Sequence, residues 1–128
     1  ALDDPWTVLA CLNALGDMAF DEGDYDTAWT ELSEAARMEA GMQDLPMLMR
    51  SLVTLGGVCL KTGRTQLGLN VLATALQNPA CQVDYVQKGR RWLAESGEVL
   101  PQAPPPLEDL LARLQACAPP AGGDESKR

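Results

Sequence analysis

The sequence predicts an all-α protein built from antiparallel helical hairpins that stack on one another. Three observations lead to this prediction: apolar residues recur at helical spacing, helix start and stop residues separate these stretches, and the same landmarks return after 40 residues. The apolar fraction of 46 % comes mainly from Leu and Ala, which favour helices. Long β-branched runs are absent, so a sheet is not expected.

The first predicted hairpin begins at the amino end of the sequence. Asp4 suits a helix N-cap and Pro5 the first helical position, so a helix is expected to begin there. This helix is expected to end at Gly23. A second helix is expected from about Tyr25 to Gly41, where glycine is a natural stop.

The second predicted hairpin has the same signals. Its first helix follows Asp44 and ends at Gly63. Its second helix runs from about Thr65 and is closed by Asn78 and Pro79, because proline cannot continue a helix.

The remaining sequence predicts two further helices separated by a proline-rich connector. A fifth helix is expected over 82–96, a stiff connector over 102–106, and a short leucine-rich helix over 107–114 that covers an exposed apolar face. Since at least three stacked units are usual, the last two helices are expected to act together as the third unit. The predicted division is a repeat domain at 1–98, a connector and capping helix at 99–118, and a disordered tail at 119–128.

An internal repeat relates the first two hairpins. Gly16 and Ala28 fall where the helices of one hairpin approach closely, so small side chains are needed there. Leu12, Leu15 and Leu32 are expected to fill the space between hairpins, because a lone hairpin cannot bury both its faces. The matched positions are Leu12 with Leu52, Leu15-Gly16 with Leu55-Gly56, Gly23 with Gly63, Ala28 with Gly68, Leu32 with Leu72, and Ala35 with Ala75.

These landmarks resemble the tetratricopeptide repeat. Two signature positions differ, because Leu12 stands for the usual Trp and Ala19 for the usual Tyr, and the period exceeds the typical length of about 34. The longer helices are similar to the tetratricopeptide-like modules of large bacterial signalling ATPases and transcriptional activators, which sense an inducer or hold a partner. The resemblance covers residues 5–98 and implies a short right-handed α-solenoid.

The resemblance also implies that the first helix of each hairpin lines a concave, partner-binding surface. Grooves of this kind combine charged side chains with an apolar anchor. Phe20, the only Phe, lies beside Asp17 and suits such an anchor; the alternative is that it packs against its own turn. The expected partner-binding residues are Asn13, Asp17, Phe20, Arg50, Val53, Gly57 and Leu60.

The sequence does not favour an enzyme. It contains no histidine, which removes histidine-dependent nucleophile arrangements and the commonest metal ligand. No phosphate-binding or zinc-protease motif is present, and the acidic run at 21–26 lacks the spacing of a calcium loop. No catalytic residue, cofactor or metal is therefore expected.

Charge narrows the class of partner. The net charge of −8 argues against direct nucleic-acid binding, and no apolar run suggests a membrane span, so a cytoplasmic protein is expected. Residues 1–49 contain eleven acids and one base, a net charge of −10, whereas residues 50–98 have a net charge of +3. Such an asymmetry either steers a partner or belongs to a solvated repeat surface.

Two functional hypotheses remain. The first is an interaction module of a larger bacterial regulatory protein that binds a protein segment or a small inducer on its concave surface. The alternative is a structural spacer or self-association segment of a longer helical solenoid. An exposed leucine on the first helix would favour the alternative, because an upstream repeat would normally stack there.

Overall fold

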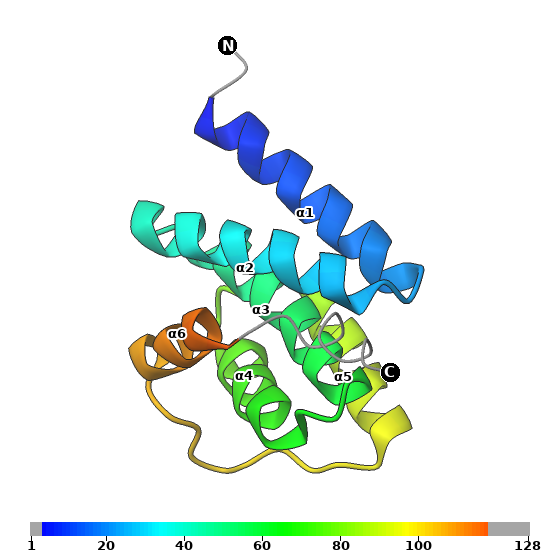
Figure 1. Cartoon of the computed structure of the whole chain (residues 1–128). Coiled ribbons are helices and arrows are strands. Elements are labelled where there is room, and N and C mark those ends of the chain that lie inside the picture. The colour runs from blue at the N-terminus through cyan, green and yellow to red at the C-terminus, as the bar shows by residue number, and fades with distance from the viewer. Residues whose placement is uncertain (1–3, 118–128) are drawn as a thin grey trace.

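The computed structural model describes residues 4–117, which fold into six α-helices. The first four form two hairpins, α1 with α2 and α3 with α4, and these stack through α2 and α3 (Figure 1). The predicted all-α class is confirmed over this range, whereas the tail predicted at 119–128 lies outside it. The helices are α1 (Pro5–Asp21), α2 (Tyr25–Met42), α3 (Leu45–Lys61), α4 (Thr65–Gln77), α5 (Val83–Ser96) and α6 (Leu107–Ala116).

The turn inside each hairpin has the same geometry. Gly23 and Gly63 both adopt left-handed φ angles, 81° and 88°. In the first turn the Asp24 N–H donates to the Ala19 carbonyl at 2.8 Å, and the equivalent bond in the second turn measures 2.9 Å. A residue with a Cβ would be strained at either glycine, so the sequence stops both helices at the predicted place.

The turn between the hairpins differs from the prediction. Gly41 still belongs to α2, and the left-handed residue is Gln43, with φ 59°. The Asp44 N–H then donates to the Glu39 carbonyl at 3.0 Å, which closes the turn. The Asp44 side chain accepts from the Met47 N–H at 3.3 Å and caps α3, so the backbone bonds define this turn without a glycine.

Two glycines allow the helices of each hairpin to approach closely, as predicted. A Cβ added at Gly16 would lie 2.4 Å from Leu32 Cγ, and one at Gly56 would lie 2.7 Å from Leu72 Cγ. Both leucines are fully buried. The small residue and the leucine opposite it therefore set the spacing of the two helices in each hairpin.

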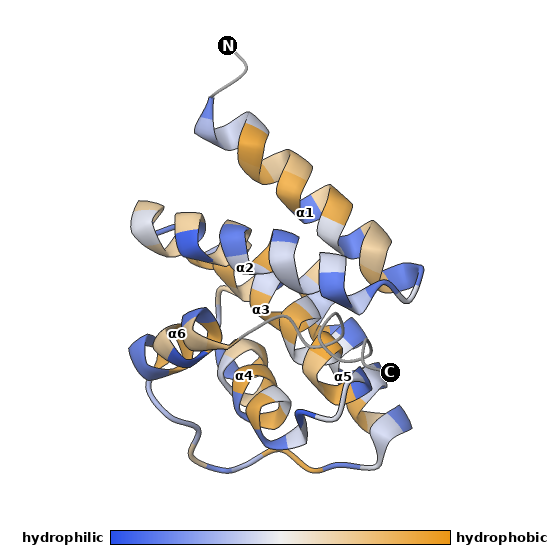
Figure 2. Cartoon of the chain, in the orientation of Figure 1, coloured by the Kyte–Doolittle hydropathy of each residue, from blue (hydrophilic) through white to orange (hydrophobic). Residues whose placement is uncertain are grey.

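The core is centred on α3. Every residue from 51 to 59 is buried, and α1, α2, α4 and α5 all pack against this helix. A helix enclosed on all sides has apolar or small residues around its whole circumference, as α3 does. Figure 2 shows the hydrophobic ribbon of α3 and α4 at the centre of the fold, with hydrophilic segments at the turns.

The last two helices do not form the predicted third unit. α5 packs mainly on α3, whereas α6 packs on α2 and α4, and these two helices do not pack against each other. The connector between them passes around α4 (Figure 1). Leu110 and Leu114 of α6 are buried, and α6 packs on α2 and α4. This helix therefore covers an apolar face, as expected, but the face belongs to α2 and α4.

Replacing Gly16 by Ala is expected to lower the free energy of unfolding by about 1–2 kcal/mol. The added methyl group overlaps Leu32, and this overpacking exceeds the gain in helix propensity. Gly41→Ala is the matched control, because nothing lies within 4 Å of its Cβ position and about 1 kcal/mol of stabilisation is expected. Urea denaturation measures both, and equal stabilisation by the two substitutions would contradict the close approach.

Candidate functional site

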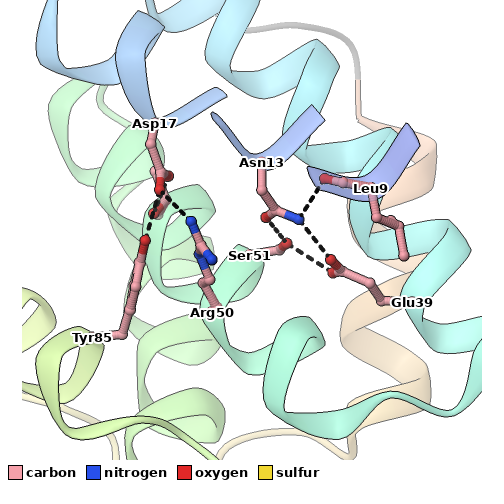
Figure 3. A network of polar contacts seen from close by, with 8 residues as sticks. Leu9, Asn13, Asp17, Glu39, Arg50, Ser51 and Tyr85 are labelled. Carbon is pink, nitrogen blue, oxygen red and sulfur yellow. Dashed lines mark hydrogen bonds and ion pairs between the residues drawn. The ribbon is translucent and has the colours of Figure 1, made fainter. Parts of the chain in front are cut away.

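A polar cluster around Asp17 joins α1, α3 and α5. Its carboxylate accepts hydrogen bonds from Arg50 Nη2 at 3.3 Å, Thr54 Oγ1 at 3.2 Å and Tyr85 Oη at 2.7 Å (Figure 3). The guanidinium of Arg50 also lies over the Tyr85 ring, 5.1 Å from its centroid. Two predicted partner-binding residues, Asp17 and Arg50, are therefore brought together, but they bind each other and α5.

Burial and charge both shift the ionisation of this cluster. Burial of the phenol, together with the hydrogen bond to Asp17 and its charge, raises the pKa of Tyr85 to about 12. Burial by itself would lower the pKa of Arg50, but Tyr85 and Asp17 outweigh it and raise that pKa. At neutral pH Tyr85 is thus a neutral donor and Arg50 a cation, an arrangement suited to holding α5 against α1 and α3.

A second polar cluster lies between α1, α2 and α3 and is completely buried. Asn13 Nδ2 donates to the Leu9 carbonyl at 3.0 Å and to Glu39 Oε2 at 2.9 Å (Figure 3). Ser51 Oγ lies 3.0 Å from Asn13 Oδ1 and 2.8 Å from Glu39 Oε1. Since Asn13 is only 1 % exposed, this predicted partner-binding residue offers no surface to a partner.

The hydrogen bonds of the buried cluster are all satisfied when Glu39 is protonated. Ser51 has a single hydroxyl hydrogen but two oxygen acceptors within reach. A protonated Glu39 can donate to Ser51, which then donates to Asn13, so every group finds a partner. Burial raises the pKa of Glu39, although the hydrogen bonds from Asn13 and Ser51 oppose the shift. The folded protein therefore favours the neutral carboxyl group.

Phe20 packs within its own chain, as the alternative interpretation of the sequence described. Its ring centroid lies 5.5 Å from that of Tyr25, which follows its own turn, and 4.6 Å from that of Trp92 on α5. The side chain is 8 % exposed. Phe20 is thus an apolar anchor, but the side chain it anchors is Trp92 of the same chain.

α5 also covers most of the remaining predicted surface. A Cβ at Gly57 would lie 2.7 Å from the Trp92 ring, and Val53 is completely buried. Leu60 is partly exposed and lines a small hollow beside Trp92. The seven predicted residues do lie along α1 and α3, but they do not form one open surface, because α2 and α3 enclose Asn13 and α5 packs over most of the others.

An uncovered apolar surface lies on the other side of α1. Trp6, Leu15 and Met18 are 58 %, 50 % and 56 % exposed, and Cys11 and Ala14 between them are also exposed. Leu15 was expected to fill the space between hairpins; it is exposed because no described helix packs on this side. We call this surface the α1 outer face; it consists of Trp6, Ala10, Cys11, Ala14, Leu15 and Met18.

The internal repeat shows how unusual this exposure is. At four of these six positions the residue 40 places later is buried on α3, whereas its equivalent on α1 is exposed; the equivalents of Trp6 and Ala10 are Pro46, which is exposed, and Arg50, which is partly exposed. The repeat gives both helices the same sequence pattern, but within residues 4–117 no helix packs on this side of α1. The exposed and buried pairs are Cys11 and Ser51, Ala14 and Thr54, Leu15 and Leu55, and Met18 and Val58.

A mainly apolar hollow lies between α6 and the turn that joins α2 to α3. Its walls carry Leu45, Leu48, Leu107 and Leu111, with Glu108 at its edge. Specific small-molecule sites usually add several convergent polar groups to such a lining. Among the residues that the structure describes, this hollow has the apolar lining of such a site but not several convergent polar groups.

The four cysteines carry free thiols in the structure. Cys59 is buried, and burial raises the pKa of its thiol to about 12. A thiol with so high a pKa is not an activated nucleophile. Cys11 is exposed on the α1 outer face.

Comparisons with known proteins found no match from which a function could be inferred. No family model, curated protein or solved structure matches this chain. Within residues 4–117, no group of side chains is placed to hold a metal ion. None of the six helices is both long enough and apolar enough to cross a membrane.

Replacing Glu39 by Gln is expected to remove a pH-dependent loss of stability. The raised pKa means that the folded protein retains a proton that the unfolded chain releases. Wild-type stability therefore falls as the pH rises from about 4.5 through the folded-state pKa. The amide makes the same hydrogen bonds without titrating, so the stability advantage of the variant should grow with pH.

Urea unfolding between pH 4.5 and neutrality measures this advantage. Glu34→Gln is the control, because Glu34 is an exposed carboxylate paired with Arg37 and should give no comparable gain. A stability difference between Glu39→Gln and wild type that stays constant with pH would show that Glu39 is ionised in the folded protein.

Replacing Tyr85 by Phe is expected to cost about 1–2 kcal/mol, because Asp17 loses its shortest hydrogen bond in a half-buried cluster. Tyr25→Phe is the control, since the Tyr25 ring packs on Phe20 and its hydroxyl makes no side-chain hydrogen bond to another residue of 4–117. Urea unfolding gives both values. Alkaline titration of wild type should also show one tyrosine ionising near pH 12, and its absence would contradict the cluster geometry.

Proposed function

We propose that this chain is a non-catalytic, tetratricopeptide-like interaction module whose partner binds the α1 outer face. The observation that carries the proposal is the contrast between this exposed face and its buried equivalent on α3. Contiguous apolar surfaces of this kind on soluble proteins mark interaction sites. The tetratricopeptide-like assignment is supported by the 40-residue repeat, the two equivalent glycine turns and the glycine–leucine contacts.

The wider setting of the module comes from the sequence resemblance. Modules of that kind serve large regulatory proteins, so the proposed role is to hold a partner within such a protein. Binding is assigned to the α1 outer face because α5 occupies the concave side, where Asp17, Arg50 and Phe20 are already engaged. The exposed Leu15 is also the feature that the sequence analysis gave as favouring the spacer or self-association hypothesis, and the test below separates the two.

The test compares variants that change the α1 outer face with variants that change other surfaces. Leu15→Gln with Met18→Gln makes the face polar without adding charge, and both positions are exposed, so the fold should be retained. Each protein is immobilised and used to capture partners from a lysate of the source organism. A specific partner retained by wild type and lost, by about tenfold or more, from the double variant is the expected result.

Two control variants make the result specific. Val83→Gln changes a side chain that is 68 % exposed on α5, away from α1, and should leave capture unchanged. Leu60→Gln probes the hollow that remains on the concave side. Loss of the partner with Leu60→Gln but not with the double variant would return the binding site to the concave surface, and capture of nothing by any variant would favour the spacer.

A further inference from the structure

We propose that the occupant of the α1 outer face is an amphipathic helix with an apolar stripe and with Lys or Arg side chains near the carboxyl end of α1. This inference rests on the proposed function of that face and names the chemistry of its partner. It follows from three features of the described residues: what covers the equivalent face of α3, which charges border the α1 outer face, and what another copy of the chain would bring to it.

The first feature is the way in which the fold covers α3. The face of α3 equivalent to the α1 outer face is covered by the preceding helical hairpin. Within that contact Ser51 bonds to Glu39 of α2, and Thr54 bonds to Asp17 of α1. The α1 outer face has the same helical spacing, so we expect a helix to pack on it, with the side-chain ridges of that helix lying in the grooves between the side chains of α1.

The positions on α1 that correspond to Ser51 and Thr54 of α3 show which side chains a partner helix needs. Cys11 stands in place of Ser51 and Ala14 in place of Thr54, so neither position offers a hydroxyl to a polar partner, and the hydroxyl of the neighbouring exposed Thr7 already donates to Asp4. Trp6, Leu15 and Met18 surround these small residues. The complementary surface is an apolar stripe with larger side chains opposite Cys11 and Ala14, where the approach is closest.

The second feature is a group of acids at the carboxyl end of the face. Asp21 and Glu22 are exposed there, and Asp21 follows Ala14 and Met18 on the same side of the helix by its spacing. Carboxylates at a helix carboxyl end oppose the helix dipole, and the last turn of α1 contains no basic residue. The ion pairs within residues 4–117 are Arg37 with Glu34 and Arg50 with Asp17, so neither acid is neutralised by a neighbour. A partner cation would relieve this repulsion.

The third feature concerns a second copy of the chain. Two copies meeting through the α1 outer face would bring together two segments of 1–49, each with a net charge of −10. An antiparallel contact would place Asp4 of one copy near Asp21 of the other, with like charges opposed. Stacking end to end is also blocked, because α5 and α6 cover α3 and α4 at the other end. The charge balance therefore favours a basic helix.

The size of the face sets the expected strength of binding. α1 has 17 residues and is about 25 Å long, which suits a partner helix of similar length. A single helix on this face buries less surface than the roughly 1,200–2,000 Å² of a standard interface, so a micromolar dissociation constant is expected. Opposite charges at the edge should make the affinity fall as salt is added.

The test uses two fluorescein-labelled peptides with the sequence of residues 25–42, the helix that covers α3 in this fold. Both carry Glu39→Leu, which makes the buried stripe apolar opposite Cys11. One peptide then has a net charge of −2; the other also carries Asp26→Lys, Glu31→Lys and Glu34→Lys, which change the net charge to +4 without altering the rest of the stripe. Fluorescence anisotropy with the full chain measures both. The basic peptide should bind about tenfold more tightly, and this advantage should shrink with salt.

Variants of the full chain separate the apolar and charged contributions. Leu15→Gln with Met18→Gln should weaken binding of the basic peptide about tenfold or more, whereas Val83→Gln should leave it unchanged. Asp21→Asn with Glu22→Gln should reduce the preference for the basic peptide while leaving the acidic peptide's affinity nearly unaltered. Circular dichroism of each variant confirms that the helices are retained.

Several outcomes would overturn the inference. Equal affinity for the two peptides, or a preference that survives Asp21→Asn with Glu22→Gln, would remove the basic partner but leave the face as a binding site. Sedimentation showing a dimer that is lost in Leu15→Gln with Met18→Gln would assign the face to a second copy. Failure of both peptides to bind, while a cellular partner is still captured through the α1 outer face, would refute this inference and leave the proposed function standing.

Discussion

The enclosure of α3 on all sides is the constraint on which the rest of this structure depends. Because α1, α2, α4 and α5 all pack against it, every residue from 51 to 59 lies in the interior. Gly56 and Gly57 are needed there, since a Cβ at the first would overlap Leu72 and one at the second would overlap Trp92. The spacing of the hairpins and the position of α5 therefore both follow from the packing around one helix.

Enclosing α3 also brings polar side chains into the interior, and each must find a partner. Ser51 meets Asn13 and Glu39 deep in the contact between the hairpins, whereas Thr54 meets Asp17 nearer its edge. In the deeper cluster, the hydrogen bonds are all satisfied when the carboxyl group of Glu39 is neutral. In the shallower cluster, Arg50 and Tyr85 both donate hydrogen bonds to the carboxylate of Asp17. Together they fix the register of α1 on α3 and attach α5 across the side on which a partner groove was expected.

The two ends of the helical stack differ in how they are covered. At one end α5 and α6 lie on different sides of the second hairpin and protect its apolar surface. At the other end α1 keeps an apolar side exposed, and the acids around it are not balanced by bases. An exposed apolar surface costs solubility unless it has a binding role, and its acidic border selects the charge of what binds.

The sequence by itself determined the helices, the turn inside each hairpin and the pairing of the first four helices, because each depends on residues close together in the chain. Asp24 and Asp44 cap helices, Gly23 and Gly63 form the turns inside the hairpins, and the repeat matches one hairpin to the next. It also located Gly16 at the close approach of two helices, although the structure shows that the side chain opposite it is Leu32. It did not determine where α5 and α6 would pack, because a proline-rich connector allows several placements and only the apolar surfaces left by the first four helices select one.

The predicted partner-binding residues were chosen by their place on the helices, and their availability was decided by Tyr85 and Trp92, which are far away in sequence. Whether a helix side is buried depends on what lies across from it, so only the tertiary structure could show that Leu55 is enclosed and Leu15 is not.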